Sequence, residues 1–421
     1  MAGTACPRAA ASRNHLDAAR RACALLGGLA SLQVAIAAEP VCVGRFDPAG
    51  ALWTLASPSL PALPPEALGS NTRFGRRVGA GDFEHDGFDD LVVTFNVTAM
   101  AGTSGARGAL VILRGGPQGP GSGGTSWIAG EQIDAGVPRF FGDAIAIGDF
   151  NGDGVDDLVV GASGNGDPVA GKVYELHGGD TGLDPSDARI WDRDVPGIAG
   201  DAGDEDNFAT VLVAGDFNGD GIDDLAIAAG RDFQSPSAMR GVVHVLWGSA
   251  SGLDASEAVA LAYPAGKGEA EDIVPRAAMD SDRNGCDELV VSFIAQVSET
   301  APLACLVDSF DSATPVWNCW GAHSQSVPAA SSSEASFAVL SSAETAQILV
   351  GASEANVDGV PLAGQVRRWH ALDSDVGVIE PEASPWLAPV PDSPGSFSRF
   401  GRALAIADVD RDGVSDVIVG E

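Results

Sequence analysis

The sequence contains one acidic, glycine-rich segment twice in nearly identical form. "GDFNGDGVDDLVV" begins at Gly148 and "GDFNGDGIDDLAI" begins at Gly215, 67 positions later. Each copy continues into a β-branched apolar segment of the kind that forms strands. Repetition at this spacing predicts an array of similar supersecondary units.

Four further copies follow the same plan. Three keep the acidic loop: "FGRRVGAGDFEHDGFDDLVV" from Phe74, "RAAMDSDRNGCDELVVSF" from Arg276 and "FGRALAIADVDRDGVSDVIVG" from Phe400. The fourth, "FAVLSSAETAQILVGAS" from Phe337, keeps both flanks and lacks the loop. The repeats therefore start near residues 74, 141, 208, 276, 337 and 400.

Each repeat has the punctuation of four short strands. Two strands flank the acidic loop, and a third follows in "GKVYELHGG", "GVVHVLWGS" and "GQVRRWHAL". A fourth is marked by Trp127, Trp191, Trp320 or Trp386. Four antiparallel strands without helical periodicity predict an all-β fold, a β-propeller of four-stranded antiparallel blades.

The two ends of the chain are predicted to share one blade. "CVGRFDPAGALWTLA" from Cys42 resembles "CLVDSFDSATPVWNCWG" from Cys305, which reads as a hairpin of third and fourth strands. The copy from Phe400 stops just after its second strand, so residues 41–56 would complete it and remove the open sheet edges. This arrangement predicts six blades, or seven if the sequence is truncated.

The acidic loops carry oxygen donors at alternating positions. In the loop after Gly148, positions 1, 3, 5 and 9 are Asp149, Asn151, Asp153 and Asp157, and Val155 offers a backbone carbonyl at position 7. Hard oxygen ligands in this number suit Ca²⁺. An EF-hand needs Glu at position 12 and flanking helices, but position 12 is apolar in all five loops and the flanks are strands.

The same register gives about five candidate calcium sites. One alternative is that Asp, Asn and Gly only form polar turns, but five loops in one register favour metal. The candidate ligands in the other four loops are Asp82, Glu84, Asp86, Phe88 and Asp90; Asp216, Asn218, Asp220, Ile222 and Asp224; Asp280, Asp282, Asn284, Cys286 and Glu288; and Asp408, Asp410, Asp412, Val414 and Asp416.

The Phe-Gly opening, the Gly-Asp-Phe-Asn-Gly-Asp-Gly loop and the "LVVGAS" strand resemble FG-GAP repeats, as in the N-terminal β-propeller of integrin α-subunits. The resemblance covers roughly residues 41–421. It implies calcium loops on one face, between the first and second strands of the blades. It also implies that ligands often meet the opposite face and its longer loops.

The first 37 residues read as an export signal. Arg13, Arg20 and Arg21 precede the apolar run "ACALLGGLASLQVAIA", which is short for a membrane span, and small residues offer cleavage before Ala38. A retained anchor is the alternative. Residues 38–421 would form the propeller, secreted, periplasmic or at the cell surface, with no membrane span after cleavage.

The net charge limits the classes of binding partner, and the cysteines suggest a disulfide. The formal net charge of −34 repels phosphate backbones, so nucleic acid is not expected. Cys305 and Cys319 are symmetric about Ser312, which suggests a cross-strand disulfide, with two buried thiols as the alternative. Cys42 and Cys286 have no evident partner.

Function is predicted less sharply than fold. The chain has no HExxH, GxSxG or Walker-type motif, so we expect no enzyme but a non-catalytic binding or cell-adhesion module for an extracellular protein or glycan. The alternatives are a carbohydrate-binding or carbohydrate-active protein that uses the face opposite the calcium loops, and a purely structural surface protein. The unrepeated segments from Thr94, Ala229 and Ser292 would discriminate between them.

Overall fold

A computed structural model gives the arrangement of the strands. The described residues are 75–97, 107–116, 121–138, 140–163, 170–199, 208–229, 241–262, 272–280, 284–294, 302–307, 310, 317–322, 336–341, 346–352, 365–371, 379–381, 386–387, 403–407 and 416–420. The predicted signal segment 1–37 and the predicted closing strands 41–56 lie outside them.

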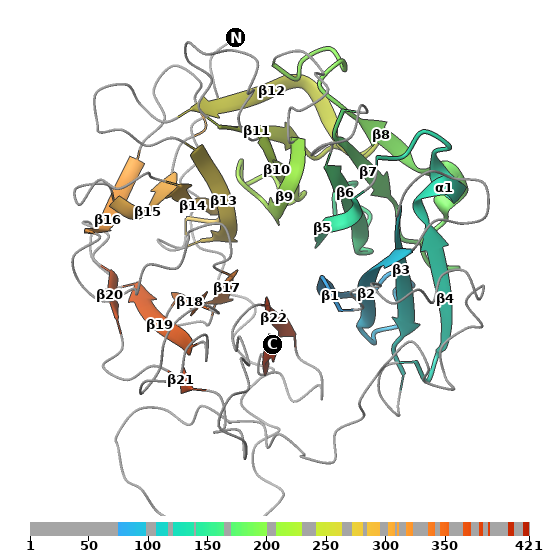
Figure 1. Ribbon diagram of the computed structural model, residues 1–421, viewed down its shortest axis with the longest axis horizontal. Coiled ribbons are helices and arrows are strands. Elements are labelled where there is room, and N and C mark those ends of the chain that lie inside the picture. Colours follow the sequence, from blue (N-terminus) through green and yellow to red (C-terminus); the bar gives the residue numbers. More distant parts are fainter. Residues whose placement is uncertain are drawn as a thin grey trace, which may run out of the picture.

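Within the described residues, six antiparallel sheets follow one another, and we number them as blades one to six (Figure 1). Blade one contains β1 (Val78–Gly81), β2 (Asp90–Val97), β3 (Arg107–Arg114) and β4 (Gly124–Ala129). Blade two contains β5 (Phe140–Gly148), β6 (Asp157–Ser163), β7 (Lys172–Leu176) and β8 (Arg189–Trp191). Blade three contains β9 (Phe208–Gly215), β10 (Asp224–Ala229), β11 (Val242–Trp247) and β12 (Asp254–Ala262).

The second half of the chain repeats this order. Blade four contains β13 (Asp272–Met279), β14 (Glu288–Ile294), β15 (Pro302–Val307) and β16 (Trp317–Ala322). Blade five contains β17 (Ser336–Ser341), β18 (Ala346–Ala352), β19 (Gln365–Ala371), β20 (Ile379–Pro381) and β21 (Trp386–Leu387). Blade six is described by β22 (Ala403–Ala407) and β23 (Asp416–Gly420).

The strands predicted from the repeat are present in blades one to five, and in blade six the two strands that flank the acidic loop are present. Trp127, Trp191 and Trp320 lie in β4, β8 and β16, the fourth strands of their blades, and Trp386 lies in β21, which pairs with β19. The helical elements of the described residues are the four-residue α1 (Gly130–Ile133) and the 3-10 turn Pro185–Asp187.

The first strands of the blades face the centre of a ring (Figure 1). Each contacts the first strand of the next blade, and β22 contacts both β17 and β1. The inner strands therefore close on themselves, and the predicted β-propeller fold is confirmed.

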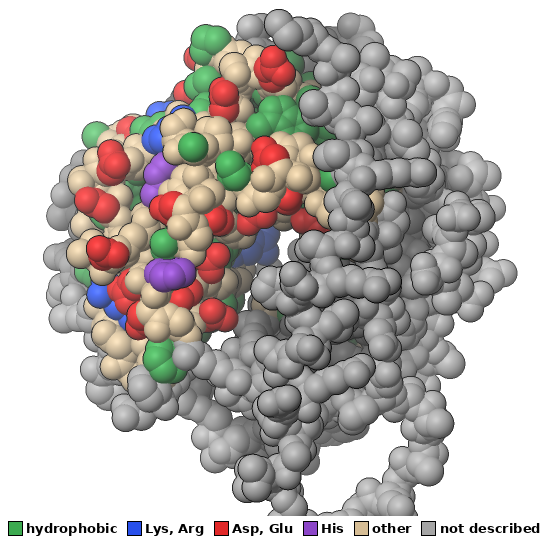
Figure 2. Space-filling view, turned by 180° about the vertical axis from the view of Figure 1, so that it is seen from behind, with side chains coloured by type: hydrophobic (Ala, Val, Ile, Leu, Met, Phe, Trp, Pro, Cys, Tyr) green, Lys and Arg blue, Asp and Glu red, His purple; other side chains and the backbone are tan. Residues whose placement is uncertain are grey.

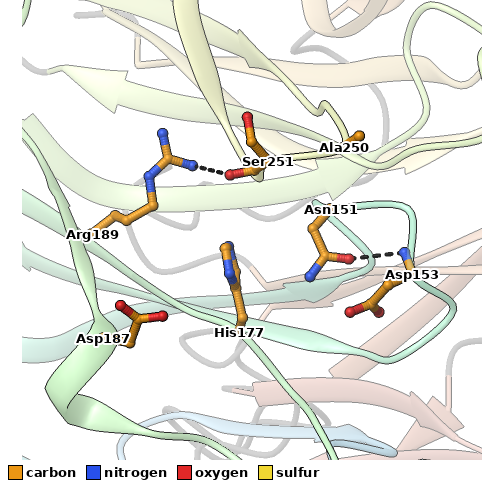
Figure 3. A pocket seen from close by; sticks show the side chains of 7 residues that line it. All are labelled: Asn151, Asp153, His177, Asp187, Arg189, Ala250 and Ser251. Carbon is orange, nitrogen blue, oxygen red and sulfur yellow. Dashed lines mark hydrogen bonds between the residues drawn. The ribbon is translucent and has the colours of Figure 1, made fainter.

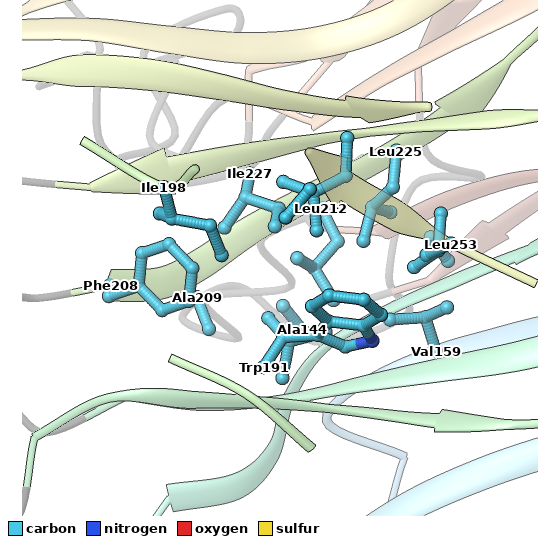
Figure 4. Close-up of a cluster of buried hydrophobic side chains, with 14 of the residues drawn as sticks. Ala144, Val159, Trp191, Ile198, Phe208, Ala209, Leu212, Leu225, Ile227 and Leu253 are labelled. Atoms are coloured by element: carbon cyan, nitrogen blue, oxygen red, sulfur yellow. The ribbon is translucent and has the colours of Figure 1, made fainter. Parts of the chain in front are cut away.

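The hydrophobic core lies between blades. One cluster joins blades two and three, where Trp191 and Val159 meet Phe208 and Leu225 (Figure 4). Further clusters join blades one and two, three and four, and five and six. Blades two and three each have a neighbouring blade on both faces. Strands β6 and β10 are therefore buried along their whole length, which explains their continuous apolar sequences.

A buried carboxylate also joins blades two and three. The Glu175 side chain, which is fully buried, accepts hydrogen bonds from Trp191 Nε1 and from the backbone N–H of Leu253, both at 2.8 Å. His177 Nε2 lies 2.8 Å from Glu175 Oε1. Arg189 lies 3.4 Å from the same carboxylate and donates to the carbonyls of Ser251 and Leu253. This network satisfies a charge that would otherwise destabilise the interior.

The predicted Cys305–Cys319 pair has compatible geometry. Cys305 in β15 lies directly opposite Cys319 in β16, and Cys305 is disulfide-bonded. The side chain of Cys319 is outside the described residues, so the pairing of these two remains a prediction. Cys286, for which the sequence offered no partner, is also disulfide-bonded.

His244 predicts a pH dependence of stability. The residue is 1% exposed, its ring packs edge-on against Phe208, and neither ring nitrogen has a hydrogen-bond partner. Burial, together with the charge of Arg193, lowers the pKa of His244 to about 4. Below about pH 6.5, His244 therefore binds a proton in the unfolded chain but stays neutral in the folded chain.

We expect this difference to cost on the order of 3 kcal/mol of unfolding free energy as the pH falls from 7 towards 4. In His244→Phe this part of the loss should disappear. Urea unfolding of both proteins between pH 7 and 4.5 checks it, and parallel pH profiles for the two proteins would contradict it.

Candidate metal-binding loops

The acidic loops connect the first and second strands of their blades, as predicted. Loops one to four follow β1, β5, β9 and β13 and are numbered by their blades. Loop two starts at Asp149 and loop three at Asp216. The loop of blade six and Asp282 of loop four lie outside the described residues, and only the backbone of Asp416 is described.

The first aspartate of each described loop folds the loop around itself. Asp149 accepts the backbone N–H of Asp153 at 3.1 Å through Oδ1 and that of Gly154 at 2.8 Å through Oδ2. Asp82, Asp216 and Asp280 accept the same two N–H groups of their own loops. Gly154 has a φ of +84°, a conformation that L side chains rarely adopt.

The residues at positions 3 and 5 tighten the same turn. Asn151 Oδ1 accepts the N–H of Asp153 at 2.8 Å (Figure 3), and Asn218 accepts that of Asp220 at 2.8 Å. At position 5 the side-chain oxygen accepts the N–H of position 7, at 2.8 to 2.9 Å, in Asp86, Asp153, Asp220 and Asn284. The described parts of the four loops thus share one pattern of hydrogen bonds, although loops one and four differ in sequence from loops two and three.

The acid at position 9 connects the loop to the end of the third strand. Asp157, fully buried, accepts the N–H groups of Gly178 at 2.8 Å and Phe150 at 3.1 Å. Asp224 does the same with Gly248 and Phe217. In loop one, Asp90 accepts from Gly115, and its buried Oδ2 has no hydrogen-bond partner.

The position 9 carboxylates are held among like charges. Burial, with Asp153 and Asp149 nearby, raises the pKa of Asp157 to about 7. Burial, with Asp220 and Asp216, raises the pKa of Asp224 to about 8. Burial, with Glu84, Asp86 and Asp82, raises the pKa of Asp90 to about 6. A divalent cation at these loops would relieve this repulsion.

The chemistry of the donor set fits a hard cation. A carboxylate oxygen has two lone pairs, so each oxygen that accepts one N–H retains a lone pair for an ion. Carboxylate, amide and carbonyl oxygens are also the ligands that Ca²⁺ takes. However, no three His, Cys, Asp or Glu side chains of the described residues converge closely enough to enclose a metal.

Loop one departs from the predicted ligand pattern. Glu84 at position 3 forms an ion pair with Arg114, with Oε1 2.7 Å from Nε. Arg114 also donates to the carbonyl of Thr181 at the edge of blade two. In this structure the Glu84 carboxylate therefore neutralises an arginine.

Sequence reasoning missed two sets of loop residues. Phe83, Phe150 and Phe217 at position 2 are buried, and each anchors its loop in a hydrophobic cluster. The aspartates at position 8, Asp156, Asp223 and Asp287, bond to the neighbouring blade. Burial and nearby loop aspartates raise the pKa of Asp223 and Asp287 to about 6. The signal for both sets was their recurrence at one position of the repeat.

A pocket of about 360 Å³ lies beside loop two. Asn151 and Asp153 line one side, His177 projects between them and Asp187, and Arg189 and Ser251 close the other side (Figure 3). Among the coloured residues of the face seen in Figure 2, acidic side chains outnumber basic ones.

Comparison with known families identifies the repeat. The family model of the FG-GAP repeat matches residues 141–176 and 208–246, which are β5 to β7 and β9 to β11 with their loops. The predicted resemblance to FG-GAP repeats is confirmed: the chain is a β-propeller that contains them.

The chain is similar to integrin α-subunits and to a phospholipase D. Integrin alpha-IIb of Homo sapiens is 29% identical over 255 residues, which are 58% of this chain and 22% of the relative. Integrin alpha-PS2 of Drosophila melanogaster is 28% identical over 201 residues, 44% of this chain and 12% of the relative. Phosphatidylinositol-glycan-specific phospholipase D of Rattus norvegicus is 37% identical over 111 residues, 26% of this chain and 13% of the relative.

The similarity therefore spans less than a quarter of the length of these relatives. Within the described residues, no helix is long and apolar enough to cross a membrane.

Proposed function

We propose that the protein is an exported, calcium-stabilised β-propeller that acts as a non-catalytic binding or cell-adhesion module. The observation that carries the proposal is the recurrence of one loop conformation, with oxygen donors at positions 1, 3, 5 and 9. In loops two and three, backbone N–H groups already hold the position 1 carboxylate in a tight turn. An ion would draw the side chains of the other positions towards this carboxylate, and the turn that already exists lowers the cost of that ordering.

The similarity to integrin α-subunits supports a role in binding other macromolecules. The net charge of −34 disfavours nucleic acids and supports a partner that is basic or neutral. The phospholipase D matches cover 13% of that enzyme, and we therefore propose no catalytic activity from them. Extracellular proteins and glycans remain the partner classes that we propose.

The calcium assignment is tested by removing the first ligand of one loop. Asp149→Ala should bind about one calcium ion fewer than the wild type in isothermal titration. It should also lose about 1–2 kcal/mol of stability without metal, since Asp149 caps two N–H groups.

Asp180→Ala is the matched control, because Asp180 is exposed and lies outside the loops. Equal calcium stoichiometry in Asp149→Ala and Asp180→Ala would refute a site at loop two.

The binding role is tested with the calcium-loaded protein on arrays of glycans and extracellular-matrix proteins. Saturable binding to one class would identify the partner. Absence of binding to both would leave a structural role as the better account, and turnover of a bound glycan would contradict the non-catalytic assignment.

A further inference from the structure

In blades two, three and four, the aspartate at position 8 of the acidic loop accepts a hydrogen bond from the preceding blade. Asp156 of blade two accepts the N–H of Asp82 at 2.8 Å, and Asp223 of blade three accepts that of Asp149 at 2.9 Å. Asp287 of blade four accepts that of Asp216 at 3.1 Å. In each case the donor is position 1 of the preceding loop.

Two of these contacts are reciprocal. The N–H of Asp223 donates to the carbonyl of Asp149 at 3.0 Å, and the N–H of Asp287 donates to that of Asp216 at 2.7 Å. Two hydrogen bonds in opposite directions fix the first residue of one loop against the eighth residue of the next.

The glycine before position 1 makes room for this contact. A Cβ on Gly148 would lie 2.5 Å from Asp223 Oδ2, and a Cβ on Gly215 would lie 2.9 Å from Asp287 Oδ2. Carbon cannot approach a carboxylate oxygen so closely, so the contact requires glycine before position 1 as well as aspartate at position 8.

One of the five copies with an acidic loop lacks the aspartate at position 8. Asp89, Asp156, Asp223 and Asp287 stand at position 8 in blades one to four, but the last copy has Ser415 there. Blade six follows blade five, whose copy lacks the acidic loop. The exception therefore falls in the one loop-bearing blade whose predecessor has no loop to hold.

We propose that the position 8 aspartates are positioning residues that couple each calcium loop to the loop of the preceding blade. This inference rests on the calcium binding proposed above. The backbone N–H of position 1 is fixed by the position 8 carboxylate of the next blade, while the position 1 carboxylate folds its own loop. An ion in one loop therefore binds to a backbone that the loop of the next blade has already ordered. The neighbour is ordered in turn by its own ion. Binding at adjacent loops is thus positively cooperative.

The experiment is amide hydrogen exchange of the full chain, followed on segments 148–157 and 215–224 with and without calcium. In the wild type, calcium should protect both segments. In Asp223→Ala, segment 148–157, which lies in the other blade, should need roughly ten-fold more calcium for half protection. Segment 215–224, which contains the substitution, should shift less.

Two further variants separate positioning from a general loss of structure. Asp223→Asn keeps an acceptor for the Asp149 N–H and should restore most of the calcium response of segment 148–157. Gly148→Ala leaves every candidate ligand in place but crowds the Asp223 carboxylate, so it should reproduce the effect of Asp223→Ala.

The possible failures differ from one another. If calcium protects neither segment of the wild type, the proposed calcium sites are wrong. In that case the hydrogen bond between the Asp149 N–H and the Asp223 carboxylate is tested without metal: segment 148–157 should exchange faster in Asp223→Ala than in the wild type. If calcium protects both segments but Asp223→Ala changes only segment 215–224, the proposed coupling is wrong and the calcium sites stand.

Discussion

Millimolar calcium is expected to raise the melting temperature of the protein, and a chelator is expected to lower it. Binding to the folded state alone adds about 2.7 kcal/mol per site when calcium exceeds its Kd a hundred-fold. With about five proposed sites, this is the largest single effect that we expect on stability. Differential scanning calorimetry in calcium and in EDTA measures it.

Magnesium is the matched control for this experiment. Mg²⁺ requires near-ideal octahedral geometry and keeps its water, so at equal concentration it should raise the melting temperature less than Ca²⁺ does. Equal shifts with both ions would indicate general screening of the acidic charge. Identical melting in calcium and chelator would contradict the metal assignment.

Glu175→Ala is expected to destabilise the protein by about 3–5 kcal/mol, as removal of one member of a buried ionic network usually does. The substitution leaves Trp191 Nε1 and the N–H of Leu253 without their acceptor, and it leaves Arg189 beside a cavity. Since Leu253 belongs to blade three, the contact between blades two and three should loosen first. The urea midpoint measures the change.

Two variants set the scale for Glu175. Glu175→Gln keeps the shape and one acceptor oxygen, so its cost should be smaller than that of Glu175→Ala. Glu257→Ala changes an exposed glutamate and should lie within about 0.5 kcal/mol of the wild type. If Glu175→Ala behaves like Glu257→Ala, the buried network does not hold the two blades together.

The fold was predictable because the repeat carries its own register. Trp191 and Trp320 sit at one position of unlike sequences, and this recurrence revealed strands that composition alone would not. The hairpin symmetric about Ser312 likewise predicted the pairing of Cys305 with Cys319 across β15 and β16.

The candidate site was predictable only in part. Alternation of oxygen donors marks positions 1, 3, 5 and 9, but it does not reveal that Glu84 pairs with Arg114, which belongs to another segment of its blade. The role of Asp223 was also hidden, since its partner Asp149 lies 74 positions away in another blade. Contacts between blades are not encoded in the spacing within one repeat.

The most direct measurement of the central claim is the number of calcium ions bound per chain, counted by native mass spectrometry after exchange from a chelator. Our account predicts about five ions in the wild type, one for each copy that keeps the acidic loop, with none at the copy from Phe337. A chain that retains no calcium under conditions where it is folded would contradict the account.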